Sequence, residues 1–462
     1  MSLRCLLLCA LFSAQLPSLL ADPPSAPILI KDARIVTAAG PVIEKGSILI
    51  RDGLIVQAAP SIQAPAGAWV IDASGLTVYP GLIDALSTWG IPSAAPATMP
   101  GSAASASTAR TQSAQPRARG PEDRPQTSSW VRAADLVQPS DRRLDQARSA
   151  GFTTAITFPK DGIVAGQGAA INLAGDSSGE MVLDPSTGMY VALRAGRGFG
   201  GGFPSSLMGV MSYVRQLWMD AQWCKSARGI YEKNPQSVPR PAYDRAAEGV
   251  LEAKRVLLPA SSKVEFERIT RFAAGLNTPA ILYGGQEAFR SIDSIKKSGY
   301  PVIVNVKWPT KQRDADPEVI DTYRTLETRD KAPASPIELA KAGIPFAFSS
   351  DGLDSPFDLV KAVKKSIDAG LKKEDAIAAL TINAARIYSL DRRIGSIEAG
   401  KIANLTVVKG DLFDSSSKIQ MVFIDGRKYE PAPESPTPPG GASGGGSRRP
   451  GAASGFTSEV SQ

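Results

Sequence analysis

The sequence predicts an α/β fold in which a (β/α) barrel is joined to a small β-domain built by both ends of the chain. The middle of the chain alternates apolar strands with helices over roughly 300 residues. Both ends are instead rich in short strands of similar composition. This alternation favours a closed barrel over an open sheet, although spacing alone does not exclude the open sheet.

The strand-rich ends share one turn signal. Arg51-Asp52-Gly53 and, near the C-terminus, Asp425-Gly426 each provide the Asp-Gly pair that favours a tight hairpin turn. We therefore expect one composite β-domain, a small sandwich, from residues 28–77 and 392–430. Its predicted strands are 28–36, 48–50, 54–56, 69–71, 405–408 and 421–424.

The barrel is predicted over residues 78–391. Apolar residues at three- and four-residue spacing predict a helix over 207–225. Ser335-Pro336-Ile337-Glu338 has the pattern of a capping box with proline at the first helical position, and Gly343 ends that helix. The other predicted elements are strands at 152–158, 280–282, 302–304 and 344–348, and helices at 140–150, 286–297, 356–369 and 373–380.

Three segments are predicted to lie outside the folded core. Residues 1–21 have a short basic start, a short apolar run and a small residue before a polar turn, which is typical of a secretory signal peptide. We therefore expect export to a periplasmic or extracellular location, with no membrane span, since the apolar run is too short. The composition of residues 93–128 and 431–462 predicts a disordered insert and a disordered tail.

Composition excludes several chemistries. The 462 residues include no histidine, so a Ser–His–Asp triad, a Cys–His dyad and any histidine-bound metal are impossible. The formal net charge is +7, and no basic patch interleaved with aromatic residues predicts nucleic-acid binding. Of the three cysteines, only Cys224 lies outside the predicted signal peptide. It is expected to pack in the core of its helix and not to act as a nucleophile.

Four segments carry a family resemblance. Val78 to Ala85, reading VYPGLIDA, resembles the first barrel strand of the amidohydrolase superfamily in its imidazolonepropionase-like branch. Residues 342–352, 379–386 and 395–405 resemble the eighth strand, the helix that follows it and the return to the β-domain. The resemblance covers roughly residues 28–430. It implies a (β/α)8 TIM-like barrel and hydrolysis of carbon–nitrogen bonds by water bound to zinc or another divalent metal.

The metal ligands that the resemblance implies are missing. The paired first-strand histidine positions hold Leu86 and Thr88, and two middle-strand positions hold Pro259 and Gly284. Only the last-strand aspartate remains, as Asp351, which in the family is a ligand or a proton shuttle. Asn404 stands where active relatives usually have an acidic residue. We therefore expect no bound metal cofactor.

Other residues offer alternatives. A carboxylate pair from Asp84, Asp351, Asp161 and Asp176 could perform acid–base chemistry or hold Mg²⁺ or Ca²⁺. In the simpler interpretation, Asp84 caps a turn and Asp351 accepts backbone N–H groups. The remaining candidates have no supporting motif: Ser349 and Ser350, which lack a base; Lys160 and Lys307, which lie near strand ends as does the carbamylated lysine of binuclear relatives; and the Gly-rich loop 196–203, which lacks a phosphate-loop ending.

The main hypothesis is therefore a catalytically inactive, metal-free amidohydrolase homologue, a pseudoenzyme with a binding or partner-subunit role. Its partner would be a second copy, an active amidohydrolase in a heteromer, or a small ligand at the barrel mouth. The alternative is a divergent hydrolase of non-peptide carbon–nitrogen bonds that uses carboxylates or an oxygen-ligated metal. A third hypothesis assigns partner docking to the insert at residues 93–128.

Overall fold

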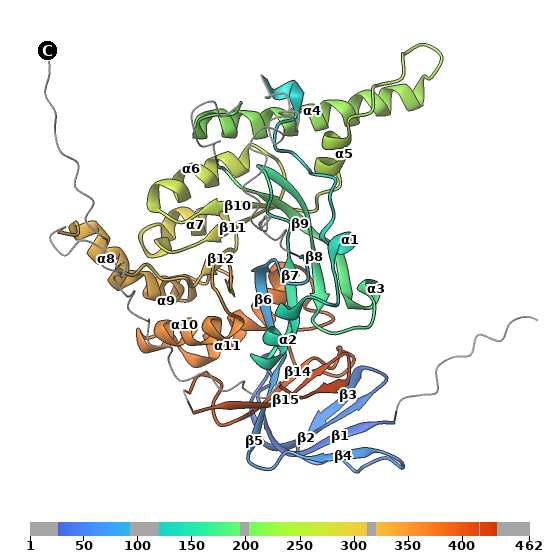
Figure 1. Ribbon diagram of the computed structural model, residues 1–462, viewed down its shortest axis with the longest axis vertical. Coiled ribbons are helices and arrows are strands. Elements are labelled where there is room, and N and C mark those ends of the chain that lie inside the picture. Colours follow the sequence, from blue (N-terminus) through green and yellow to red (C-terminus); the bar gives the residue numbers. More distant parts are fainter. Residues whose placement is uncertain (1–25, 93–119, 195–202, 312–319, 415, 432–462) are drawn as a thin grey trace, which may run out of the picture. The chain divides into compact units, whose positions relative to one another are not determined.

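We describe the chain from a computed structural model, which describes residues 26–92, 120–194, 203–311, 320–414 and 416–431. The strands form two eight-stranded sheets (Figure 1). The predicted signal peptide, the C-terminal tail from residue 432, residues 93–119 of the insert and all but Phe203 of the Gly-rich loop lie outside the described residues. Within the described residues, no helix is both long enough and apolar enough to cross a membrane.

The first sheet combines strands from both ends of the chain. Its order is β16-β15-β14-β5-β1-β2-β3, and β4 pairs with β1. Strand β5 joins the two ends, because it pairs with β1 on one side and antiparallel to β14 on the other. The strands are β1 (Ile28–Ile35), β2 (Ile43–Arg51), β3 (Leu54–Ala59), β4 (Trp69–Asp72), β5 (Leu76–Pro80), β14 (Leu405–Lys409), β15 (Lys418–Ile424) and β16 (Arg427–Tyr429).

Both predicted Asp-Gly turns are present in this sheet. Asp52 and Gly53 have φ of 50° and 77°, and Asp425 and Gly426 have φ of 52° and 74°. Two consecutive positive φ values define the tight hairpin turn that Asp-Gly favours. The turns touch each other, since a Cβ on Gly426 would lie 2.7 Å from Gly53 Cα. The sheet therefore brings residues 52 and 425 together at one place.

The second sheet is the barrel, and the predicted α/β barrel class is confirmed. Its order is β6 to β13 in sequence, and β13 also contacts β6, so that the sheet nearly closes. Seven strands are parallel, but β8 runs antiparallel to both neighbours. The strands are β6 (Leu82–Ser87), β7 (Phe152–Thr157), β8 (Val164–Asn172), β9 (Val182–Val191), β10 (Val256–Ala260), β11 (Ala280–Gly284), β12 (Val302–Asn305) and β13 (Phe346–Ser349).

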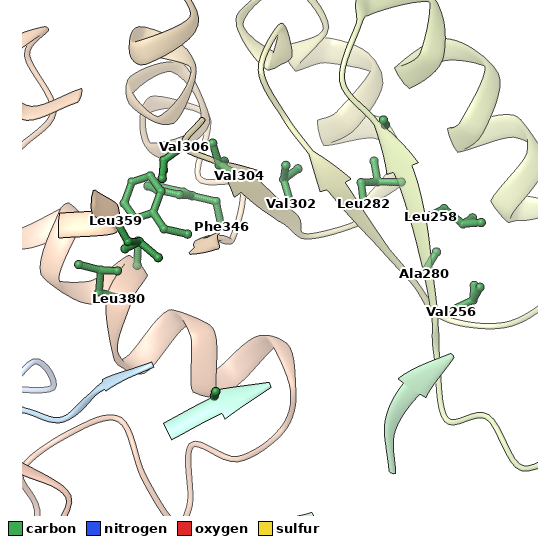
Figure 2. Close-up of a cluster of buried hydrophobic side chains, with 14 of the residues drawn as sticks. Val256, Leu258, Ala280, Leu282, Val302, Val304, Val306, Phe346, Leu359 and Leu380 are labelled. Carbon is green, nitrogen blue, oxygen red and sulfur yellow. The ribbon is translucent and has the colours of Figure 1, made fainter. Parts of the chain in front are cut away.

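Two layers of apolar side chains position the barrel strands. On the outer face, strand residues such as Leu258, Leu282 and Val304 belong to one buried cluster that also includes helix residues such as Leu359 and Leu380 (Figure 2). The helices are α1 (Ala133–Leu136), α2 (Arg142–Ser149), α3 (Ser178–Met181), α4 (Leu207–Lys233), α5 (Arg245–Leu251), α6 (Lys263–Ala274), α7 (Ile292–Ser298), α8 (Tyr323–Lys331), α9 (Ser335–Lys341), α10 (Pro356–Asp368), α11 (Lys373–Leu380) and α12 (Ile382–Ile387).

The barrel interior is filled by its own side chains. Phe158, at the end of β7, lies between the rings of Tyr190 and Tyr388, with centroids at 6.0 and 6.4 Å. Gly168 on β8 makes room for it, because an added Cβ would lie 2.1 Å from the Phe158 ring. Tyr388 follows α12 and donates a 2.7 Å hydrogen bond to the carbonyl of Ala85 in β6. This interior is a packed core and not a channel.

Three local predictions differ from the structure. The capping box at Ser335 is wrong: Ser335 is the first residue of α9, and its Oγ instead donates to the carbonyl of Gln286 and accepts from the Phe289 N–H. Full burial of Ser335 makes these bonds to a neighbouring segment preferable to a local cap. The helix predicted over 286–297 is instead a 3₁₀ turn (Ala288–Arg290) followed by α7, and α4 continues eight residues beyond 225.

The predicted disordered insert also extends too far. Residues 120–128 are placed, with a 3₁₀ turn at Pro121–Asp123. The Arg124 guanidinium forms ion pairs with Asp220 of α4 and Asp244 before α5, at 2.7 Å each. The polar composition of this segment predicts disorder only when its charges have no partners, and here two carboxylates hold the arginine.

Candidate functional site

The four positions that lack histidine lie on β6, β10 and β11 or just beyond them. Leu86 is buried in the barrel interior. Thr88 follows β6, and its hydroxyl and carbonyl oxygens each accept a 3.0 Å hydrogen bond from Arg143. Pro259 is the last residue but one of β10 and pairs with Tyr283, whereas Gly284 ends the neighbouring strand β11 and pairs with Ala260. Leu, Pro and Gly side chains offer no donor atom, and the Thr88 hydroxyl is already bound.

The remaining family position, Asp351, forms an ion pair. Its carboxylate contacts the Lys160 ammonium, which comes from the segment after β7. The sequence predicted that the Asp351 carboxylate accepts backbone N–H groups of its own turn. In the structure it contacts the Lys160 ammonium instead. The Asp351 carbonyl accepts a 2.8 Å hydrogen bond from the Asn305 side chain at the end of β12. Lys160 Nζ also lies 5.8 Å from the centroid of the Tyr190 ring. The structure therefore brings Lys160 and Asp351 together across the barrel mouth.

Asp84 is the most perturbed carboxylate among the described residues. It is fully buried in β6, and its Oδ1 accepts from the N–H groups of Leu86 and Ser350 at 3.2 and 3.1 Å. Its Oδ2 accepts from the Ser350 hydroxyl. Burial raises the pKa of Asp84 to about 7, although the hydrogen bonds from Ser350 and the charge of Lys160 oppose this shift. Asp84 caps a turn as predicted, and it also joins β6 to the segment after β13.

Two tyrosines that sequence reasoning missed line the interior beneath this ion pair. The rings of Tyr190 on β9 and Tyr283 on β11 stack at 5.1 Å. The Tyr283 hydroxyl donates a 3.1 Å hydrogen bond to the carbonyl of Val191. Burial raises the pKa of Tyr190 to about 12. Inward-pointing alternation along β11, with Ile281 and Tyr283 on one face, was the available signal.

Both the NH2 group and the oxygen of the Asn404 side-chain amide form hydrogen bonds. Its Nδ2 donates to Asn172 Oδ1 at 2.8 Å and Thr154 Oγ1 at 3.1 Å, and its Oδ1 accepts from the Asp425 N–H at 2.9 Å. It therefore joins the start of β14 to β7 and β8 by side-chain hydrogen bonds. The Asn404 side chain thus lies in a buried polar network between the two sheets.

Of the other predicted candidates, Lys307 borders this site, since a Cβ on Gly352 would lie 3.4 Å from Lys307 Cδ, and the rest make no contact with the ion pair that the structure describes. Asp161 and Lys307 are exposed, and exposed Asp176 forms an ion pair with Arg427 near the strands of the first sheet. Ser349 is buried in β13. Cys224 is half-buried on α4, where burial raises its thiol pKa, which does not favour a nucleophilic thiolate.

The side chains of the site do not fit the metal that the fold family usually holds. Catalytic zinc sites use three or more nitrogen, sulfur or carboxylate ligands. Here Asp84 directs both oxygens to Ser350 and Leu86, and Asp351 is neutralised by Lys160. Within the described ranges, no three Cys, Asp or Glu side chains converge in a way that would hold a metal ion. No catalytic step is therefore assigned to a metal.

Comparisons with known proteins find similarity over part of the chain. Residues 261–428 match the family model described as Amidohydrolase family. The chain is 39% identical over 64 residues to an adenine deaminase of Clostridium botulinum (strain Loch Maree / Type A3), which covers 14% of this chain and 10% of that protein. It is 38% identical over 80 residues to an adenine deaminase of Methanococcoides burtonii, covering 16% and 13%. These matches span only about a tenth of each deaminase.

A solved structure extends the likeness along the whole barrel. The structure of an amidohydrolase from Thermotoga maritima MSB8 superposes with a TM-score of 0.70, covering 87% of this chain and 100% of the other. The two sequences are 23% identical, so this likeness concerns the fold. The chain is therefore similar to the amidohydrolase family over residues 261–428, and it shares the fold of a solved amidohydrolase over most of its length.

Proposed function

We propose that this protein is a non-catalytic homologue of the amidohydrolases, in which the barrel binds a ligand or partner and does not carry out metal-dependent hydrolysis. One observation supports this most directly. Of the family positions that supply metal ligands, four have no free donor and the fifth, Asp351, forms an ion pair with Lys160. A metal at this place would have to replace the Lys160 ammonium and still find two or more further ligands.

The packing of the barrel interior supports the same proposal. The stacked rings of Tyr190 and Tyr283, together with Phe158, fill the volume beneath the ion pair. All three are at least nine-tenths buried. A packed, neutralised end stabilises the fold, whereas a catalytic end would leave ligand positions open for water and substrate.

The alternative, hydrolysis of a carbon–nitrogen bond without metal, has one observation in its favour. Asp84 has a pKa of about 7 and contacts the Ser350 hydroxyl, so it could exchange a proton near neutral pH. Against it, Asp84 is fully buried and Ser350 is 7% exposed. Both oxygens of Asp84 are held by protein donors, which leaves the carboxylate no approach to a substrate.

Metal content tests the proposal. The protein is purified without a histidine tag, because a tag would add the only histidines in the sample. It is then incubated with Zn²⁺, Mn²⁺ and Mg²⁺ in turn, freed of unbound ions and measured by elemental analysis. The expected result is far less than one metal per chain. About one metal per chain that is lost in Asp351→Ala but kept in Asp161→Ala would overturn the proposal.

Activity assays separate the two candidates. Adenine is one substrate to test, because the curated relatives are named adenine deaminases, and simple amides are others. The non-catalytic proposal expects no ammonia release above a heat-denatured sample. Release that disappears in Asp84→Asn and Asp351→Ala, while the exposed control Asp161→Asn keeps it, would support hydrolysis by carboxylates instead.

A further inference from the structure

The barrel has a seam where its first strand, β6, meets its last strand, β13. Every other neighbouring pair of barrel strands, from β6–β7 to β12–β13, is joined by backbone hydrogen bonds. Strands β6 and β13 are in contact, but within the described residues no such pairing joins them. A closed barrel ordinarily leaves no unpaired strand edge. The β6–β13 seam therefore interrupts the backbone hydrogen bonding of this sheet.

The Asp84 side chain bonds to both sides of this seam. Its Oδ1 accepts from the Leu86 N–H of β6 at 3.2 Å and from the Ser350 N–H, directly after β13, at 3.1 Å. Its Oδ2 contacts the Ser350 hydroxyl. One carboxyl group therefore makes the hydrogen bonds that a pair of strands would otherwise make through the backbone.

A second side chain, that of Tyr388, bonds to the same part of β6. Its hydroxyl donates a 2.7 Å hydrogen bond to the carbonyl of Ala85, the residue between Asp84 and Leu86. Tyr388 follows α12, and α12 contacts both β6 and β13. The side chains of Asp84 and Tyr388 are both fully buried. Two buried side chains thus hold the seam together.

This arrangement makes the seam easier to open than the rest of the barrel. Strands β12 and β13 pair along four residues, whereas the seam depends on a few side-chain hydrogen bonds. Proteins open locally where hydrogen bonds are few. Burial also disfavours the ionised form of Asp84 and raises its pKa to about 7. Since an open seam lets water reach the carboxylate, loss of the proton favours opening.

The groups around Asp84 weaken this effect but do not cancel it. The hydrogen bonds from Ser350 and the charge of Lys160, after β7, favour the ionised form, yet burial has the larger effect. The Lys160 ammonium is itself paired with Asp351. Burial raises the pKa of Tyr388 well above its ordinary value, so its hydroxyl stays neutral. Helix α11, which also contacts β6, buries only apolar side chains.

We propose that the barrel opens locally at the β6–β13 seam, without unfolding of the other strands, and that the Asp84 carboxyl group controls this opening. With its proton, Asp84 keeps the seam closed. Without the proton, the seam opens more often and exposes the barrel interior, where Leu86 of β6 and Ala347 of β13 are buried. This opening does not depend on whether the barrel is catalytic.

Native-state hydrogen exchange, followed by mass spectrometry, tests where the barrel opens. Peptides that cover β6 and residues 346–352 report on the seam, and peptides that cover β11 report on strands paired on both edges. At low urea concentration, the seam amides are expected to exchange faster than those of β11. Their exchange should depend little on urea, because local opening exposes little surface. Seam amides that exchange only together with β11, with the same urea dependence, would overturn the proposal.

The same measurement at pH 5 and pH 7 tests the role of the carboxyl group. After correction for the intrinsic exchange rate, opening of the seam is expected to increase about 50-fold from pH 5 to pH 7, since the exposed carboxyl group regains its ordinary pKa of 3.8. Asp84→Asn cannot ionise, so its opening should be nearly equal at both pH values. A wild type without this increase, or an Asp84→Asn variant that retains it, would contradict the proposal.

Tyr388→Phe is the matched control variant. It removes the hydrogen bond to Ala85 and leaves Asp84 able to ionise. Opening of the seam should increase at least about 2-fold at both pH values, while the ratio between them stays near that of the wild type. Loss of the pH dependence in Tyr388→Phe would show that Asp84 does not control the opening. The wild type and this variant test the proposal even where Asp84→Asn does not fold.

Discussion

The two halves of the barrel differ in regularity, although they form one sheet. In the second half, β10 to β13 are parallel and pair without register shifts. In the first half, β8 is antiparallel, and the β6–β7 and β8–β9 pairings contain register shifts. The family match begins at residue 261, in the second half. Both halves nonetheless lack ligands: Leu86 lies in one, and Pro259 and Gly284 lie in the other. The irregular backbone of the first half is therefore not the reason that histidine is absent from these positions.

The substitution with the largest expected effect on stability tests whether the irregular half of the barrel is as well packed as the regular half. Phe158→Ala removes a fully buried ring between Tyr190 and Tyr388 and should lower the free energy of unfolding by about 3–5 kcal/mol. Phe348→Ala, its buried counterpart on β13, should cost a similar amount. Urea denaturation measures both, with the 43% exposed Phe357→Ala as control. A loss below about 1 kcal/mol at Phe158 alone would mean that the first half is loosely packed.

The second prediction concerns the pH dependence of stability. It rests on Asp84, which joins the two halves of the barrel through its hydrogen bonds with Ser350. Its folded pKa, about 7, lies above its ordinary value of 3.8. Protonated Asp84 therefore favours the folded state, and this stability is fully present below pH 3.8 and lost as the pH rises through 7. Asp84→Asn cannot ionise. Between pH 4.5 and 7.5, its free energy of unfolding should rise relative to wild type by roughly 3–4 kcal/mol.

Urea denaturation of wild type and Asp84→Asn at both pH values measures this change. Asp161→Asn, at an exposed carboxylate, is the control and should follow the wild type. A constant difference between Asp84→Asn and wild type across this pH range would show that Asp84 is not buried as described.

The smallest expected effect on stability comes from the ion pair between Lys160 and Asp351, which also joins the two halves of the barrel. Their side chains are 22% and 28% exposed, so water and salt weaken the attraction. A double-mutant cycle with Lys160→Met and Asp351→Asn should give a coupling of about 1 kcal/mol or less, falling at high salt. A coupling of several kcal/mol would show that this ion pair is a major stabilising contact between the two halves of the barrel. The exposed pair Lys364 and Asp368 provides a reference cycle.

Sequence reasoning predicted the regular half better than the irregular one. Strands β11, β12 and β13 are continuous apolar runs between clear breakers, and their predicted positions agree with the structure. Strands β8 and β9 were missed because Gly166, Gly168, Asp184 and Pro185 lower their β-propensity. These two strands form through pairing with their neighbours, and Gly168 leaves the space that the Phe158 ring occupies.

The candidate site was predictable in its identities but not in its contacts. The motif VYPGLIDA located Leu86 and Thr88, and the last-strand motif located Asp351. The pairing of Lys160 with Asp351 joins residues 191 positions apart, and no local pattern encodes it. The same holds for Asp84 and Ser350, which are 266 positions apart, and for the stacked tyrosines. Such contacts follow from the closed barrel, which brings together strands that are far apart in the sequence.

The sheet built from both ends of the chain has a consequence for folding during synthesis. Thr77 of β5 pairs with Val408 of β14, and among the described residues no segment nearer in sequence pairs with that edge. At ribosomal rates of 5–20 residues per second, β5 waits roughly 16–65 s for its neighbour. Until then an unpaired strand edge stays available to other chains, which is an aggregation hazard. The first sheet is therefore completed only late in synthesis, when β14 pairs with β5. A chain shortened before residue 405 would keep the β5 edge unpaired.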